Sequence, residues 1–221
     1  GAALLIILTA LALSQSAGAL FLGVPAGIAA VVLAHFGRRA WLPLLGLGAA
    51  GAAALAVALQ SARFARILDF EQGTNFFRVR VWQSALAIIR DHPLTGLGLD
   101  QFLYAYRGQY MLPDAWQEPD LSHPHNFVLD VWTRLGIFGL ALFAVLQVEF
   151  WRRITSLLRR LKSADQHQYA IALGMTGCMI NLLVHGLVDN SIFVIDLAYV
   201  FFLLLGLSGQ LGSQRDLPRS R

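Results

Sequence analysis

Long apolar runs alternate with short polar links along most of this chain. Three runs lie in the first part of the sequence and three in the last part, and a long polar region separates the two sets. A membrane-spanning helix needs about 20 apolar residues. The pattern therefore predicts six membrane helices, the first of them truncated, at residues 1–13, 19–34, 42–59, 127–150, 169–188 and 192–211.

The polar region has a helical pattern of its own. Apolar residues recur at helical spacing between Thr74 and Pro93, at Trp82, Ala85, Leu86 and Ile89. This spacing predicts an amphipathic helix over residues 75–92 that lies near the membrane surface. Thr74 or Asn75 is a candidate cap for its start, and Pro93 is a usual stop. The following residues are typical of a turn and then a proline-punctuated loop.

Composition agrees with a membrane protein. The chain of 221 residues is 57% hydrophobic and 14% charged, against about 25% charged in a soluble domain, and its mean hydropathy is +0.59. Its one cysteine, Cys178, excludes a disulfide framework. We expect an all-α polytopic membrane helix bundle with a helical extracytoplasmic loop region. Because the sequence begins inside an apolar run, we also expect a fragment that lacks upstream helices.

The charges predict the orientation in the membrane. The short links at 35–41 and 149–167, together with the tail, carry ten Lys and Arg against three acids, whereas residues 61–134 carry seven Arg and eight acids. Basic links are cytoplasmic by the positive-inside rule. We therefore expect membrane helices at 1–59 and 126–212, an extracytoplasmic region at 60–125 and a cytoplasmic tail at 213–221. The basic residues flank the membrane, so we expect no nucleic-acid partner.

Arg78 and Arg80 are the first candidates for chemistry. An arginine near a helix N-terminus combines its guanidinium with free backbone N–H groups, which suits a phosphate or pyrophosphate. Residues two apart point about 200° apart on a helix, so both can face one ligand only if the helix starts at or after them. The alternative is that both side chains reach lipid headgroups.

The stretch "SHPHNF" contains the second group, His123, His125 and Asn126. Pro124 suits the first turn of the fourth membrane helix, which predicts His123 near the cap and His125 near the second helical position. A helix N-terminus disfavours an imidazolium, so His125 should stay neutral and able to accept a proton. Zinc needs a third ligand that the neighbouring sequence does not supply, so we expect no metal. Alternatively, the histidines only anchor the loop by hydrogen bonds.

Asn181, His185 and Asp189 form a polar stripe on the outer half of the fifth membrane helix, at i, i+4 and i+8. Ionisable residues inside a membrane helix are costly and usually face the bundle interior. His185 and Asp189 can pair, and the pair can either orient a catalytic group or fix helix packing. The sequence leaves these two alternatives open.

The order of the motifs is more specific than any one of them. The chain has "RVRVW", then "HPLTGLGLDQF", "HPHNFVLDVWTRLGIFGL" and "HGLVDN". This order resembles the O-antigen ligase and polymerase superfamily, bacterial membrane glycosyltransferases with a GT-C type fold. The resemblance runs from about residue 74 to 191 and more weakly from residue 1.

The resemblance implies an enzyme without cofactors in the bacterial inner membrane, with its active site on the periplasmic face. A glycan would move from undecaprenyl pyrophosphate to an acceptor hydroxyl, with inversion and without a metal. The acceptor is the lipid A core in ligases and the growing glycan in polymerases. His125 would be the base and Arg78 the pyrophosphate ligand, with Arg80 and Arg107 as further phosphate candidates and Asn126, His123, Asn181, His185 and Asp189 in support.

Two positions depart from the family pattern. Ala17 stands where many members have an arginine assigned to the pyrophosphate, and Arg134 stands where members often have Glu. The polymerase is the nearest rival to the ligase. A membrane protein that binds lipid-linked glycans without catalysis is a rival from another class.

Overall fold

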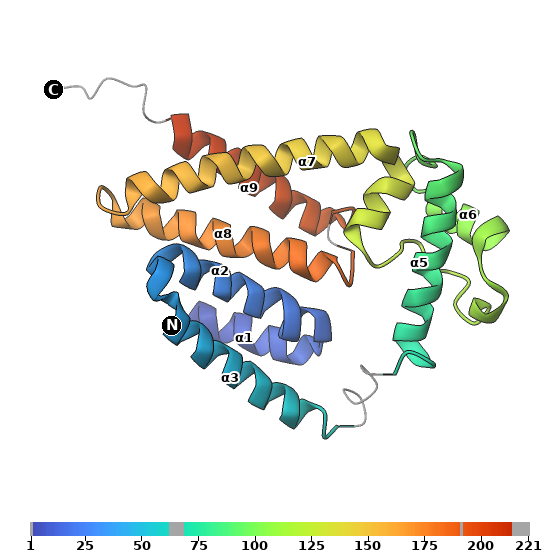
Figure 1. The fold of residues 1–221 in the computed structure, drawn as a ribbon, viewed down its shortest axis with the longest axis horizontal. Helices are drawn as coiled ribbons and strands as arrows, with labels where there is room; N and C mark the ends of the chain where they lie inside the picture. Colours follow the sequence, from blue (N-terminus) through green and yellow to red (C-terminus); the bar gives the residue numbers. More distant parts are fainter. Residues whose placement is uncertain (1, 62–68, 191, 214–221) are drawn as a thin grey trace.

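The computed structural model describes residues 2–61, 69–190 and 192–213, and every regular element within them is helical (Figure 1). The all-α prediction is therefore confirmed. In chain order the elements are α1 (Ala2–Ser14), η1 (Ala19–Gly23), α2 (Val24–Phe36), η2 (Gly37–Ala40), α3 (Trp41–Ala58), α5 (Gly73–Asp91), α6 (Phe102–Ala105), η4 (Tyr106–Tyr110), η5 (Pro113–Ala115), α7 (Phe127–Leu161), α8 (Gln166–Gly186) and α9 (Ile195–Ser213).

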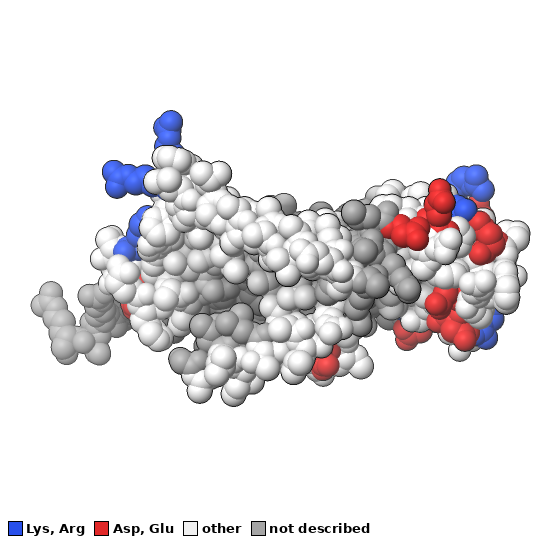
Figure 2. Space-filling model, turned by 90° about the horizontal axis from the view of Figure 1, so that it is seen from below, with Lys and Arg blue, Asp and Glu red and all other residues white. Residues whose placement is uncertain are grey.

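Long apolar helices make up most of the molecule. Among the residues that the structure describes, four helical stretches are long and apolar enough to cross a membrane: Ala19–Ala58, Phe127–Leu161, Gln166–Gly186 and Ile195–Gly212. On the face seen in Figure 2, basic side chains gather at the end near the α7–α8 turn, whereas acidic and basic side chains mix at the end with α5 and α6. A largely uncharged band lies between the two ends, as expected of a membrane helix bundle.

α8 lies in the middle of the bundle and packs closely on α2. A Cβ atom added at Gly27 would lie 2.7 Å from the Gly177 carbonyl oxygen, so only glycine allows the two backbones to approach this closely. On its other side α8 shares an apolar core with α7 and α9, which includes Phe150, Met179 and Phe201. The position of Asp189, just after α8, is thus fixed by packing on both sides.

α7 is not one continuous helix. Gly136 has φ +66° and ψ −166°, which breaks the helix after Leu135. The prediction of one uninterrupted membrane helix over 127–150 is wrong on this point. Residues 127–135 form a short segment beside α5, and the part after Gly136 runs along the bundle (Figure 1).

The turn at residues 93–98 fills the break in α7 and satisfies the backbone groups that it frees. Ile137 N–H donates to the Pro93 carbonyl at 3.0 Å, Leu97 N–H to Thr133 at 2.8 Å, and Gly98 N–H to Arg134 at 2.9 Å. A Cβ atom at Gly136 would overlap the Leu94 carbonyl. The two glycine-rich motifs, "PLTGLG" and "LGIFGL", therefore interlock.

Gly96, in the turn that packs against α7, should be needed for the stability of the fold. Gly96 has φ +65°, and an added Cβ would lie 2.7 Å from Thr133 O. We expect Gly96→Ala to lower the free energy of unfolding by about 2–4 kcal/mol, from left-handed strain and overlap together. Gly73→Ala is the control, because Gly73 has φ +71° but open space around it, and we expect a cost of about 1–2 kcal/mol. Stability is measured by denaturation of the protein in detergent micelles. An equal loss of unfolding free energy in Gly96→Ala and Gly73→Ala would contradict the close packing of the turn against α7.

α5 crosses the end of the bundle and packs against α7 (Figure 1). It runs over Gly73–Asp91, close to the predicted 75–92, with Gln72 rather than Thr74 or Asn75 at its N-cap position. Its buried face, with Val81, Ala85 and Ile88, contacts Phe102 and Tyr106. This packing holds α5 beside the loop that carries the histidines.

Candidate functional site

The loop before α7 brings His125 to Asp189. The N-cap of α7 is Asn126, whose Oδ1 accepts hydrogen bonds from Val128 and Leu129 N–H at 3.0 and 3.1 Å. The predictions that His123 caps this helix and that His125 lies inside it are therefore wrong. Asn126 Nδ2 also donates to the Leu187 carbonyl at 3.0 Å, which ties the loop to the end of α8.

His125 and Asp189 form a close pair. His125 Nδ1 lies 3.2 Å from Asp189 Oδ1, and His185 Nε2 lies 3.8 Å from the other carboxylate oxygen. His125 has φ +50°, in the left-handed region, where strained backbone often marks functional sites. With Nδ1 held by the carboxylate, Nε2 is the nitrogen left to accept a proton, as in the histidine–aspartate pairs of hydrolases.

The environment keeps Asp189 ionised. Burial by itself would raise the pKa of this carboxyl, but the hydrogen bond from His125 and the one from Asn190 N–H lower the pKa to about 2. Asp189 is therefore negative at neutral pH. A fixed negative charge at Nδ1 stabilises the imidazolium that forms when His125 takes up a proton.

His123 lies next to His125, with the ring centroids 4.3 Å apart. Burial lowers the pKa of His123, and the nearby charge of His125 when protonated lowers it further, to about 4. His123 is thus neutral at physiological pH. Its Nδ1 lies 3.2 Å from the Ser122 hydroxyl, so it is a polar but uncharged group at the site.

His123, His125 and Asp189 also bear on the prediction that the site binds no metal. One donor atom each from His123, His125 and Asp189 lies within 4.8 Å of the others. The fold therefore supplies the third ligand that was missing from the local sequence, and the argument against a metal from ligand number no longer holds. Three protein ligands with an open position are enough for a catalytic zinc site.

α5 brings one arginine toward the histidine loop. Trp82 Nε1 donates to the Pro124 carbonyl at 2.7 Å, and Arg78 lies one turn earlier on the same face of α5. The Nε atom of Arg78 is buried without a partner, and the side chain forms no hydrogen bond or ion pair with another described residue. A buried donor without a partner is costly unless a ligand satisfies it.

The other predicted arginines are paired with acids. Arg80 forms an ion pair with Asp114 at 2.7 Å and lies over the Phe76 ring, and Arg107 forms an ion pair with Asp120. Because α5 begins at Gly73, well before Arg78, the side chains of Arg78 and Arg80 point to different sides of the helix. The structure therefore does not bring Arg80 to the same ligand as Arg78, and it places Arg78 in the second turn rather than at the helix start.

The polar stripe of α8 faces the first helices. An added Cβ at Gly23 would lie 2.5 Å from Asn181 Oδ1, and one at Gly18 would lie 3.0 Å from the His185 ring. Asn181 and His185 thus lie where η1 passes α8, and His185 also approaches Asp189. The segment at residues 14–18, which contains Ala17, is therefore connected to the histidine site through the contact of Gly18 with His185.

Arg134 is the main residue that sequence reasoning missed. It is almost fully buried, donating from Nε to Asp130 at 2.7 Å, from one terminal nitrogen to Asp100 at 3.1 Å and from the other to the Ser122 carbonyl at 3.1 Å. It was noted only as a departure from the family pattern. The signal was the Asp130–Arg134 spacing of i, i+4 in an apolar helix.

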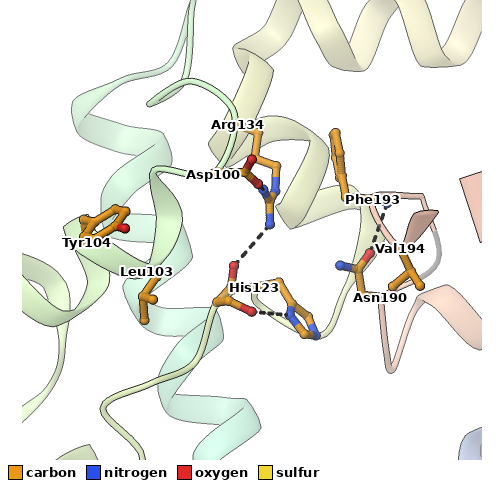
Figure 3. A pocket seen from close by; sticks show the side chains of 9 residues that line it. Asp100, Leu103, Tyr104, His123, Arg134, Asn190, Phe193 and Val194 are labelled. Carbon is orange, nitrogen blue, oxygen red and sulfur yellow. Dashed lines mark hydrogen bonds and ion pairs between the residues drawn. The ribbon is translucent and has the colours of Figure 1, made fainter.

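A cavity of about 480 Å³ opens beside His123 and Arg134. It lies between Asp100 with the start of α6, the loop at 122–123 and the segment before α9 (Figure 3). Its lining includes Asp100, Tyr104, His123, Arg134, Asn190 and Phe193. No residue of α5 is among the described residues that line it, so the cavity and the free arginine lie on different elements.

Comparison with known proteins bears on the family of the chain. A family profile described as O-antigen ligase matches residues 2–144, more than half of the chain. A Rickettsia conorii protein provisionally named polysaccharide ligase is 30% identical over 122 residues, which cover 53% of this chain and 27% of that protein. The chain thus spans only about a quarter of the length of this relative.

Proposed function

Because the chain belongs to the O-antigen ligase family, a family of membrane enzymes, we propose that it transfers a glycan from undecaprenyl pyrophosphate to an acceptor hydroxyl. The lipid A core is the acceptor that the ligase form uses. The mixed charge around α5 and α6 and the basic far end support a site on the periplasmic face of the bacterial inner membrane.

The His125–Asp189 pair is the observation that carries this proposal. His125 Nε2 takes the proton of the acceptor hydroxyl, and the hydroxyl oxygen attacks the anomeric carbon of the glycan. The bond from that carbon to the pyrophosphate oxygen breaks, and undecaprenyl pyrophosphate leaves with the electron pair. Attack from the side opposite the leaving group inverts the anomeric configuration.

Arg78 is the group that we assign to the leaving pyrophosphate. Its Nε is buried and unpartnered, and its face of α5 is joined to the histidine loop through Trp82. A guanidinium matches the geometry of phosphate oxygens and stabilises the negative charge that builds up as the bond breaks. Arg80 and Arg107 are weaker candidates, because each would first have to leave its carboxylate.

We expect Arg78→Ala to weaken binding of the lipid-linked donor by about ten- to hundredfold, because charge-assisted hydrogen bonds are worth about 1.5–3 kcal/mol. Binding is measured with the full-length protein in nanodiscs and labelled undecaprenyl-pyrophosphate-linked glycan. Arg90→Ala is the matched control, since Arg90 is on the same helix but 81% exposed. Equal binding by Arg78→Ala and wild type would mean that Arg78 only contacts lipid headgroups.

Treatment with a chelator distinguishes His125 as a metal-free base from a metal site formed by His123, His125 and Asp189. We propose that His125 acts without a metal, so EDTA treatment followed by dialysis should leave the transfer rate within about twofold of the untreated protein, since a base needs only its own proton affinity. Loss of transfer that added zinc restores would assign His123, His125 and Asp189 to a metal site instead.

A further inference from the structure

The cavity beside His123 is shaped and lined like a binding site, and the reaction proposed above does not yet use it. Its volume of about 480 Å³ lies within the range of small-molecule sites, about 300–1,000 Å³. Such sites combine apolar walls with a few polar groups that point inward. Here Leu103, Tyr104 and Phe193 supply apolar surface, and Asp100, His123 and Asn190 supply polar groups (Figure 3).

The electrostatics of the cavity disfavour a pyrophosphate. Arg134 is the one cationic side chain among the described lining residues, and its charge is already met by Asp130 and Asp100. The Asp100 side chain is 95% exposed, so it would repel an anionic ligand at the rim. A neutral ligand rich in hydroxyl groups fits this lining better, because the Asp100 carboxylate can accept its hydrogen bonds and the Asn190 side-chain amide can donate to it.

The aromatic side chains point to a sugar ring. Tyr104 is 71% exposed, so its ring is accessible to a ligand, and it stands at one wall of the cavity (Figure 3). Phe193 lies at another wall, held over the Arg134 guanidinium at 4.8 Å. Aromatic rings offer flat apolar faces with little conformational entropy to lose, and a sugar ring has apolar C–H faces between its hydroxyl groups.

The cavity shares its supporting segments with the His125–Asp189 pair. His123, on the cavity wall, is 4.3 Å from His125 between ring centroids. Asn190, also on the wall, directly follows Asp189 and donates its backbone N–H to that carboxylate at 2.8 Å. A ring in the cavity therefore lies beside the base, whereas the free arginine lies on α5.

We propose that this cavity binds the acceptor, through the sugar ring that carries the hydroxyl to be glycosylated, while the lipid-linked donor binds along α5. This assignment rests on the proposed function. Arg134 is the positioning residue of the cavity, since it holds both Asp100 and the Ser122 carbonyl, and Tyr104 is the residue that contacts the sugar.

The kinetic test uses the full-length protein in proteoliposomes. The donor is the undecaprenyl-pyrophosphate-linked glycan, and the acceptor is the glycolipid extracted from cells that lack this gene. Tyr104→Ala should raise KM for the acceptor about three- to tenfold, the size of one aromatic contact, and leave KM for the donor within about twofold. Trp116→Ala is the matched control, an aromatic of similar exposure, 65%, outside the cavity lining, and it should change neither constant.

A binding test that needs no turnover keeps the two proposals apart. Cys178 is the one cysteine in this sequence, so Tyr104→Cys places a single reactive thiol at the cavity when His125 is changed to Ala and Cys178, with any further cysteine of the full-length protein, is changed to Ser. The acceptor glycolipid should slow its alkylation by a maleimide at least about threefold, whereas the donor should not. Trp116→Cys in the same background should be alkylated equally with and without the acceptor.

Each outcome decides one of the proposals. The acceptor site is overturned if Tyr104→Ala raises KM for the donor, if the donor slows alkylation of Tyr104→Cys, or if neither Tyr104 substitution has an effect. The proposed function is retained in these cases as long as the wild type transfers glycan. Protection by the acceptor glycolipid together with no transfer by wild type would reject the proposed function but retain the site. Acceptor protection with wild-type transfer and a selective rise in the acceptor KM supports both.

Discussion

His125→Ala is expected to lower the transfer rate by about 10²–10⁴-fold, the usual contribution of a general base, and to leave binding of the lipid-linked donor unchanged. In the reaction proposed above, the acceptor hydroxyl loses its proton as its oxygen attacks, and His125 Nε2 receives that proton. Asp189, ionised and 3.2 Å from Nδ1, stabilises the charge that His125 gains. Neither residue is needed to hold the pyrophosphate.

The rate is measured as glycan transferred per minute by full-length protein in proteoliposomes, with donor binding measured in parallel. Asp189→Asn should also slow transfer, and the double variant should be little slower than His125→Ala, because the two residues act as one unit. His92→Ala, at an exposed histidine at the end of α5, is the control. Transfer at the wild-type rate by His125→Ala would remove His125 as the base.

Arg134→Ala is expected to lower the free energy of unfolding by about 3–5 kcal/mol, the usual cost of leaving a buried charge without its partner. Asp130 is fully buried and Arg134 nearly so, and the guanidinium also holds Asp100 and the Ser122 carbonyl. Without the guanidinium, the buried Asp130 carboxylate has no partner. The loops that carry Asp100 and Ser122 also lose the side chain that connects them. The acceptor cavity should lose its shape as well.

The chain offers a matched control in the same helix. Arg153 and Glu149 are also an i, i+4 pair, at 2.6 Å, but their side chains are 44% and 40% exposed. Arg153→Ala should cost at most about 0.5 kcal/mol. Both variants are compared with wild type by reversible denaturation in detergent micelles. A similar loss in the two would show that burial of the Arg134 network contributes little to stability.

The sequence predicted the helices well, because the length of an apolar run is set directly by the thickness of the bilayer. α8 and α9 lie close to their predicted runs. The break in α7 was missed because glycine inside a membrane helix is common, and nothing local shows that residue 136 has a positive φ. The cause lies in the turn at residues 93–98, which packs into the break from a distant part of the chain.

The site was predicted residue by residue but not as an arrangement. His125 and Asp189 were each selected, yet their pairing across 64 residues follows from the packing of α8 and the capping of α7 by Asn126. The histidine order also misled: Asn126, not His123, is the cap, since its short side chain reaches two backbone N–H groups. Asp100 lies in the motif "HPLTGLGLDQF" but was given no role, and Tyr104 lies outside every motif, because the roles proposed for both follow from the cavity that they line.

The packing of residues 93–98 into the break at Gly136 limits where insertions and deletions can be accepted during evolution. An insertion or deletion in either segment would shift the paired backbone groups out of register, so both should keep their lengths among relatives. The stretch at 107–121 has no such partner in α7 within the described hydrogen bonds. Length changes there should therefore leave the His125–Asp189 pair in place, and this stretch is where we expect relatives to differ most in length.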